Sequence, residues 1–155
     1  MTTTLSEVAD LFLTKVTDYR LDSIFESSGS SALNFYLEPY ILNSIDEFED
    51  ICTQDLSYTE STDDEEGYFS VNLTRENKNV LAQLMVRYWL GKSIRDILQM
   101  NNSLQDHDYK TYSQAQNLKA KQDFYNMTRE ENSQLLVDYG IKHNNWTNWK
   151  LQDFD

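Results

Sequence analysis

The chain has 155 residues, of which 39% are hydrophobic and 13% aromatic, and its formal net charge at pH 7 is -13. This composition predicts one folded domain and excludes a disordered chain, while the charge excludes a protein that binds nucleic acids by neutralising phosphates and disfavours anionic membranes. One proline and four glycines are too few for the many turns of an all-β fold and favour long helices.

The negative charge is concentrated in the first half of the chain. Residues 1–73 contain 16 acidic and two basic residues, whereas residues 74–155 contain ten acidic and eleven basic ones. A hydrated acidic surface that keeps the chain in solution is the simplest explanation. No stretch approaches roughly 18 consecutive apolar residues, so no membrane-spanning segment is expected.

The first predicted helix spans residues 4–18. Thr4 and Glu7 have the spacing of a capping box, and apolar residues at helical spacing follow: Leu5, Val8, Phe12 and Val16. Residues 27–31 are expected to form a loop. A second helix over residues 38–56 is predicted to begin with Pro39 in its first turn, where the missing amide hydrogen is tolerated.

The sequence in the middle of the chain predicts an acidic loop, a short strand and a third helix. The loop covers residues 57–67 and contains the run from Asp63 to Glu66. Alternation at Phe69, Val71 and Leu73 predicts one short extended segment. The third helix is predicted over residues 75–100, capped by Thr74. The only cysteine, Cys52, lies in the apolar pattern of the second helix and is expected to be buried.

The fourth helix is predicted over residues 113–139, after a polar connection at residues 101–112. A capping box at Ser113 marks its start, and Gly140 is suited to ending it in the left-handed conformation. A break is expected between residues 126 and 134, where Met127 is the only apolar residue.

These elements predict an all-α fold with four main helices, two of them long, one short extended segment and an extended C-terminal tail. Residues 1–140 form the helical domain and residues 141–155 an aromatic tail. The tail's large apolar residues are Trp146, Trp149, Leu151 and Phe154. They either pack back on their own domain or dock on a neighbouring subunit or partner. We prefer docking, because tryptophan is common among binding anchors.

The sequence contains no convincing catalytic, cofactor-binding or metal-binding pattern. The run Asp106-His107-Asp108 is a poor metal site, because adjacent side chains rarely point at one ion. The acidic run at residues 63–66 lacks the spacing of a calcium loop. Glycine-rich phosphate loops, nucleophile elbows and zinc patterns are missing from the sequence. We therefore expect a protein that needs no cofactor, is not an enzyme and works by binding other proteins.

Several stretches resemble one group of viral proteins. They are residues 72–74 (NLT), 80–90 (VLAQLMVRYWL), 108–115 (DYKTYSQA) and 136–139 (LVDY), with residues 18–21 (DYRL), 45–48 (IDEF) and Cys52 near the N-terminus. Together they resemble the small neck proteins of tailed bacteriophages, the adaptors or head–tail connectors, over about residues 4–140. The aromatic tail and the acidic run at residues 63–66 depart from that family pattern.

The resemblance implies a structural protein of the virion neck, made in the host cytoplasm. Such proteins are mostly helical and form rings, commonly of twelve copies, between the portal protein and the next neck or tail protein. DNA would pass through the ring without specific binding, and no membrane would be involved. In the expected loop, Asp108, Tyr109 and Tyr112 are candidates for contact with a partner, although simple exposure to solvent explains them equally well.

Two other functions were considered from the sequence. An acidic protein that mimics DNA and blocks a nucleic-acid-binding protein of the host would explain the net charge and the pI of about 4.4. Such a mimic needs carboxylates spread over one continuous face, whereas here they are concentrated in the first half. A small hydrolase has no positive support in the sequence.

Overall fold

The computed structural model describes residues 1–17, 19–103 and 108–143, with the backbone alone at residues 19–20, 100–103 and 108–116. Its elements in chain order are α1 (Leu5–Leu13), α2 (Tyr19–Phe48), β1 (Tyr58–Thr59), β2 (Tyr68–Phe69), α3 (Arg75–Ser103) and α4 (Asp108–His143). Helix accounts for 72% of the chain, which confirms the all-α prediction. The two strands are antiparallel and pair Tyr58 with Phe69.

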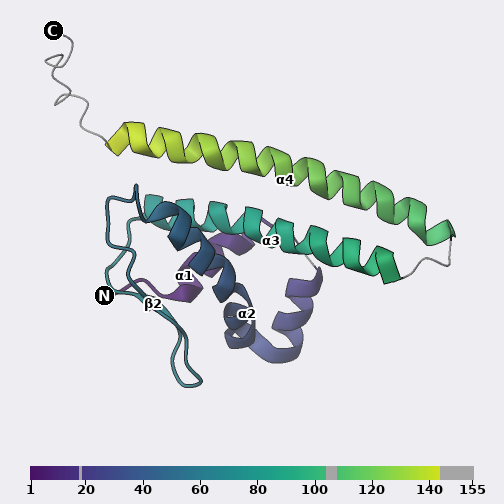
Figure 1. Ribbon diagram of the computed structural model, residues 1–155. Coiled ribbons are helices and arrows are strands. Elements are labelled where there is room, and N and C mark those ends of the chain that lie inside the picture. The colour runs from purple at the N-terminus through teal and green to yellow at the C-terminus, as the bar shows by residue number, and fades with distance from the viewer. Residues whose placement is uncertain (18, 104–107, 144–155) are drawn as a thin grey trace, which may run out of the picture.

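Helix α3 is the centre of the molecule. It packs against α1, α2 and α4. In Figure 1, α4 runs antiparallel along one side of α3, and α1, α2 and the β1–β2 hairpin occupy the other. A helix that is apolar all round must be covered on every side. The buried residues of α3 do face all directions: Val80, Leu81, Ala82, Leu84, Met85, Val86, Trp89 and Leu90.

Helix α1 buries Leu5, Val8 and Phe12 as predicted, but it ends at Leu13 rather than at residue 18, so Val16 lies outside it. Its start also differs from the prediction. The Thr4 side chain makes no capping hydrogen bond; its hydroxyl lies 3.0 Å from that of Ser6. The amide of Ser6 instead donates a hydrogen bond to the carboxylate of Glu66, far along the chain. Negative charge at a helix N-terminus is favourable. Glu7 reaches Lys78 of α3 at 3.1 Å, so the expected capping box is wrong.

Helix α2 differs most from the prediction. It begins at Tyr19 rather than residue 38, ends at Phe48 rather than 56, and includes the expected loop at residues 27–31. A kink at Gly29 (φ 83°, ψ -179°) divides it into two parts. Pro39 lies inside the helix and removes the hydrogen bond to the carbonyl of Phe35. Both residues are exposed, where water can hydrate that carbonyl.

Helix α3 fits its prediction closely, whereas α4 does not. The amide of Asn77 donates to the Thr74 hydroxyl at 3.2 Å, which confirms the predicted cap. Helix α4 begins at Asp108 rather than residue 113, continues through residues 126–134 and passes Gly140 to end at His143. The polar stretch stays helical because Thr128 and Asn132, each 1% exposed, bury their side chains on its inner face.

The last turn of α4 lies beyond residue 140, where the tail was expected to begin. Helix and packing continue from residue 140 to His143, where the described residues end. Among the described helices, none is long and apolar enough to cross a membrane.

Two glycine substitutions are expected to have opposite effects on stability. Gly29→Ala places a side chain at a positive φ and should lower the free energy of unfolding by about 1–3 kcal/mol. Gly140→Ala fills open space within a helix and should raise it by about 0.5–1 kcal/mol. Urea denaturation of both variants measures the two changes. A destabilised Gly140→Ala would contradict the continuous end of α4.

Candidate interaction surfaces

A buried tyrosine fixes the C-terminal end of α4. Tyr139 is 3% exposed, and its ring packs edge-on against Phe48 at 4.9 Å. Its hydroxyl donates to Asn77 Oδ1 at 2.8 Å. The amide of Thr53 donates to the same hydroxyl at 3.0 Å, and the Thr53 hydroxyl lies at 2.9 Å. Burial raises the pKa of Tyr139, although the hydrogen bonds from Thr53 oppose this effect.

The same cluster extends through Gln54. Its Oε1 accepts hydrogen bonds from Asn77 Nδ2 and from the amide of Thr74, each at 2.7 Å. Its Nε2 donates to the carbonyl of Asn72 at 3.1 Å. The connection after α2, the start of α3 and the end of α4 therefore meet in one hydrogen-bonded cluster.

A groove of about 690 Å³ lies between the first half of α3 and the last half of α4. Its apolar residues are Val80, Leu135 and Tyr139. Its charged residues are Lys15, Arg75, Glu76, Glu131, Asp138 and Lys142. Lys142 bonds Glu76 at 2.8 Å at one end, and Gln83 Nε2 donates to Asn132 Oδ1 at 3.3 Å near the other. Two contacts between the helices thus bound the groove along its length.

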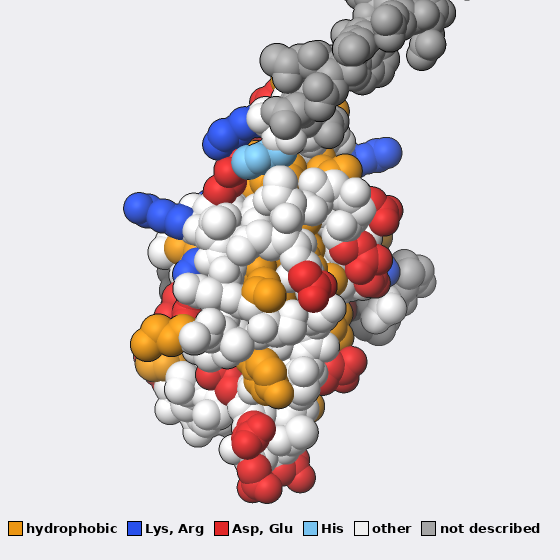
Figure 2. All heavy atoms as spheres, turned by 90° about the vertical axis from the view of Figure 1, so that its left-hand side faces the viewer, with side chains coloured by type: hydrophobic (Ala, Val, Ile, Leu, Met, Phe, Trp, Pro, Cys, Tyr) orange, Lys and Arg blue, Asp and Glu red, His pale blue; other side chains and the backbone are white. Residues whose placement is uncertain are grey.

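The last turn of α4 is held at one end of this groove. The Nε2 atom of His143 lies 3.1 Å from Glu76 Oε2, and its ring centroid is 4.3 Å from that of Tyr139. The hydrogen bond from Lys142, followed by that from His143, lowers the pKa of Glu76 below its usual value. Figure 2 looks onto this end of the molecule, where both basic and acidic side chains lie near the top of the described surface.

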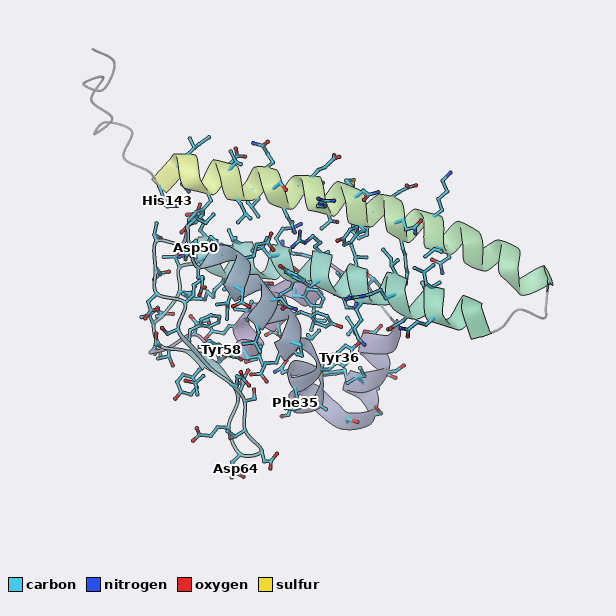
Figure 3. All side chains as sticks on the ribbon, viewed as in Figure 1. Phe35, Tyr36, Asp50, Tyr58, Asp64 and His143 are labelled. Carbon is cyan, nitrogen blue, oxygen red and sulfur yellow. The ribbon has the colours of Figure 1, made fainter. Side chains whose placement is uncertain are left out.

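Hydrogen bonds to α2 hold the base of the acidic β1–β2 loop. Glu38 of α2 is buried and accepts hydrogen bonds from the Tyr58 hydroxyl at 2.8 Å and the Ser61 amide at 2.7 Å. Burial and Glu38 both raise the pKa of Tyr58. A Cβ atom at Gly67 would overlap the Tyr58 hydroxyl. Asp64 marks the tip of the loop, away from the helices (Figure 3), and acidic side chains gather at the bottom of Figure 2.

The outer face of α4 carries exposed apolar side chains. Met127 and Val137 are 49% and 55% exposed. At about 100° per residue, Val137 points roughly opposite to Leu135 and Tyr139, which face α3, whereas Met127 lies toward the side of α4. A large apolar side chain exposed singly is ordinary, but Phe124 and Ile141 are also exposed on this helix. Together they make α4 the candidate for packing against another protein.

The residues predicted to form interaction sites lie largely beyond these surfaces. Trp146, Trp149, Leu151 and Phe154 are outside the described residues. The expected loop containing Asp108, Tyr109 and Tyr112 is wrong, because the backbone places all three in the first turns of α4; their side chains are not described. Within the described ranges, no group of three His, Cys, Asp or Glu side chains could hold a metal ion.

Sequence reasoning missed the Tyr139 cluster, the buried Glu38 and the groove. The sequence places Tyr139 at the end of the predicted fourth helix. A buried tyrosine hydroxyl requires a partner, which was the available signal for a polar cluster, but the partners come from three distant segments. Cys52, expected to be buried, is only partly so. Comparison of the chain with family models, curated proteins and solved structures found no match.

The Tyr139 cluster predicts a strong effect of removing one oxygen atom. Tyr139→Phe keeps the ring but leaves the buried Asn77 Oδ1 and Thr53 amide without their partner. We expect the free energy of unfolding to fall by about 1–3 kcal/mol. The matched control is Tyr68→Phe, at an exposed tyrosine, which should change little. Equal effects of both substitutions in denaturant titrations would contradict the assigned role of the Tyr139 hydroxyl.

The lowered pKa of Glu76 predicts a dependence of stability on pH. A carboxylate whose pKa is depressed by folding stabilises the protein above its unfolded pKa and loses that effect as the pH falls through the folded pKa. Glu76→Gln should therefore lower the melting temperature at pH 7. The difference from the parent protein should shrink as the pH falls below 4.5, the usual pKa of a glutamate, and vanish below the lowered pKa of Glu76. The control Glu130→Gln removes the same charge from an exposed site on α4 and should not reproduce this pattern.

Proposed function

We propose that this protein is a structural head–tail connector of a tailed bacteriophage. In this role, copies of the chain form a ring in the virion neck between the portal protein and the next neck or tail protein. The proposal rests first on the sequence resemblance over about residues 4–140. The structural observation that best supports it is the pair of long antiparallel helices, α3 and α4.

The helix pair suits a protein that packs side by side with copies of itself. At about 1.5 Å per residue, the 29 residues of α3 and the 36 residues of α4 extend over roughly 43 and 54 Å. Helix α4 covers only one side of α3 (Figure 1), so its outer face is available to a neighbour. The exposed Val137 and Ile141 on that face would lose water on contact, which favours association.

The two sides of the molecule differ, as a ring requires. A closed ring is built from heterologous contacts, in which one surface of each copy meets a different surface of the next. Residues 1–73, with 16 acidic residues, form α1, α2 and the hairpin, whereas α3 and α4 belong to the second half, with its balanced charge. Contact between the acidic side and the outer α4 side would generate such a ring.

The acidic side is also compatible with a channel for DNA. Carboxylates repel the phosphate backbone, so an acidic lining would let DNA pass without being retained. The alternative of a DNA mimic shares this charge. The connector is preferred because the sequence resemblance supports it, whereas the mimic rests on the charge alone.

The test is assembly with a portal. The purified chain is mixed with the portal ring from the same genome, and the complex is analysed by mass photometry and electron microscopy. We expect a ring of this chain bound coaxially to the portal. Failure to bind the portal, combined with competition against DNA for a nucleic-acid-binding enzyme of the host, would replace the connector by the mimic.

Deleting residues 144–155 tests the role of the aromatic tail in this assembly. The cut follows His143 because Lys142 and His143 bind Glu76. We expect circular dichroism to show an intact helical domain and mass photometry to show weaker ring formation, since burying several large apolar side chains contributes ~1.5–3 kcal/mol each. Unfolding of the truncated chain would place the tail in its own core. Unchanged assembly would show that the tail is dispensable.

A further inference from the structure

The groove between α3 and α4 is apolar at its centre and charged around its rim. The half-buried Leu135 supplies apolar surface, and Val80 and Tyr139, each 3% exposed, lie at its floor. The basic side chains of Lys15 and Arg75 and the acidic ones of Glu131 and Asp138 also line it. A concave site with apolar walls and a few charged groups is suited to an extended peptide that offers large apolar side chains.

The part of the chain outside the described helices has the matching chemistry. Residues 144–155 (NNWTNWKLQDFD) contain two tryptophans, one leucine and one phenylalanine. Lys150 lies among these apolar residues, and Asp153 and Asp155 follow it. At up to about 3.3 Å per residue, this segment can extend over roughly 40 Å. It is therefore long enough to lie along the groove and to present opposite charges to both parts of the rim.

We propose that the groove between α3 and α4 binds residues 146–154 of a neighbouring copy of this chain. The inference rests on the proposed ring, in which each copy would give its tail to the next copy. Trp146 and Trp149 contact the apolar surface at Val80 and Leu135. Lys150 faces the Glu131 and Asp138 side of the rim.

The contacts at the end of α4 favour binding of a neighbouring copy's tail in the groove over binding of the chain's own tail. The Lys142–Glu76 ion pair bridges α4 and α3 at the end of the groove from which the tail departs. His143 is held at the same place by Glu76 and Tyr139. To enter its own groove, the chain would have to reverse within Asn144 and Asn145 and pass over these contacts. A segment from a neighbour can enter along the open side.

Cross-linking between full-length chains tests this contact directly. In a Cys52→Ser background, or Cys52→Ala if serine is not tolerated, one variant carries Asn79→Cys in the groove. A second carries Thr147→Cys between the two tryptophans. The two are mixed under assembly conditions and treated with a short bismaleimide. A third variant, Ser30→Cys, replaces Asn79→Cys as the control, because Ser30 is exposed on α2 and is not part of the groove.

We expect the groove variant to give about tenfold more product with the tail variant than the control gives, because docking raises the local concentration of the tail. Adding Trp146→Ala and Trp149→Ala should reduce the yield to the control level. Equal yields at Asn79→Cys and Ser30→Cys would overturn the proposal. A chain carrying both cysteines gives a second test. An intramolecular product that persists on dilution would also overturn the proposal, because it means that the tail occupies its own groove.

The outcome can be separated from that of the proposed function. A ring that assembles on the portal without the specific cross-link overturns the tail docking and leaves the connector role intact. The specific cross-link in chains that do not bind the portal supports tail docking and removes the connector role.

Discussion

The fold depends on the need to cover α3 on every side. Residues 80–90 of this helix are apolar around most of its circumference, and no orientation leaves them a face suited to water. The first 73 residues cover one side by packing α1 and α2 against α3. The other side is left to α4, whose sequence is largely polar. Covering that side therefore requires α4 to bury polar groups as well as apolar ones.

Helix α4 meets this requirement with specific hydrogen bonds. Tyr139 buries its ring against Phe48 and satisfies its hydroxyl with Asn77 and Thr53. The hydrogen bonding of the Asn132 side chain is less complete, because its Oδ1 accepts a hydrogen bond from Gln83 while its Nδ2 has no partner. An unpaired buried amide opposes packing. The C-terminal end of α4 therefore makes more complete hydrogen bonds to α3 than Asn132 does.

Sequence reasoning succeeded where local rules agreed with the final packing. The apolar spacing of α1, the Thr74 cap of α3 and the all-α class follow from periodicity and capping alone. Most errors in α2 and α4 share one physical cause. Pro39, the polar run at 126–134 and Gly140 all disfavour helix locally, and the packing of neighbouring residues overrides these weak preferences. Residues 27–31 are exposed, so packing does not override their preference for a turn. Gly29 shows the limit of that effect, because the chain does leave helical geometry there.

The candidate surfaces were harder to predict because each is built from distant segments. The groove needs Lys15, which follows α1, together with α3 and α4, and the hydrogen bonds to Glu38 come from residues 20 and 23 positions away. No short sequence window contains such a site. The aromatic side chains of residues 146–154, in contrast, could be recognised from composition alone, since large apolar residues in a polar segment require a partner surface wherever they fold.

The base of the β1–β2 loop is a position where the sequence cannot change, whereas the tip of the loop can change in sequence and length. Gly67 allows no side chain because the Tyr58 hydroxyl fills the space where a Cβ would lie, and Tyr58 is in turn bonded to the buried Glu38. Beyond this base, Asp63 and Asp64 are exposed. Residues can therefore be added to or removed from the tip without disturbing the helices. The tip is the natural position for inserting a foreign epitope or label, displayed at a fixed point on the molecular surface.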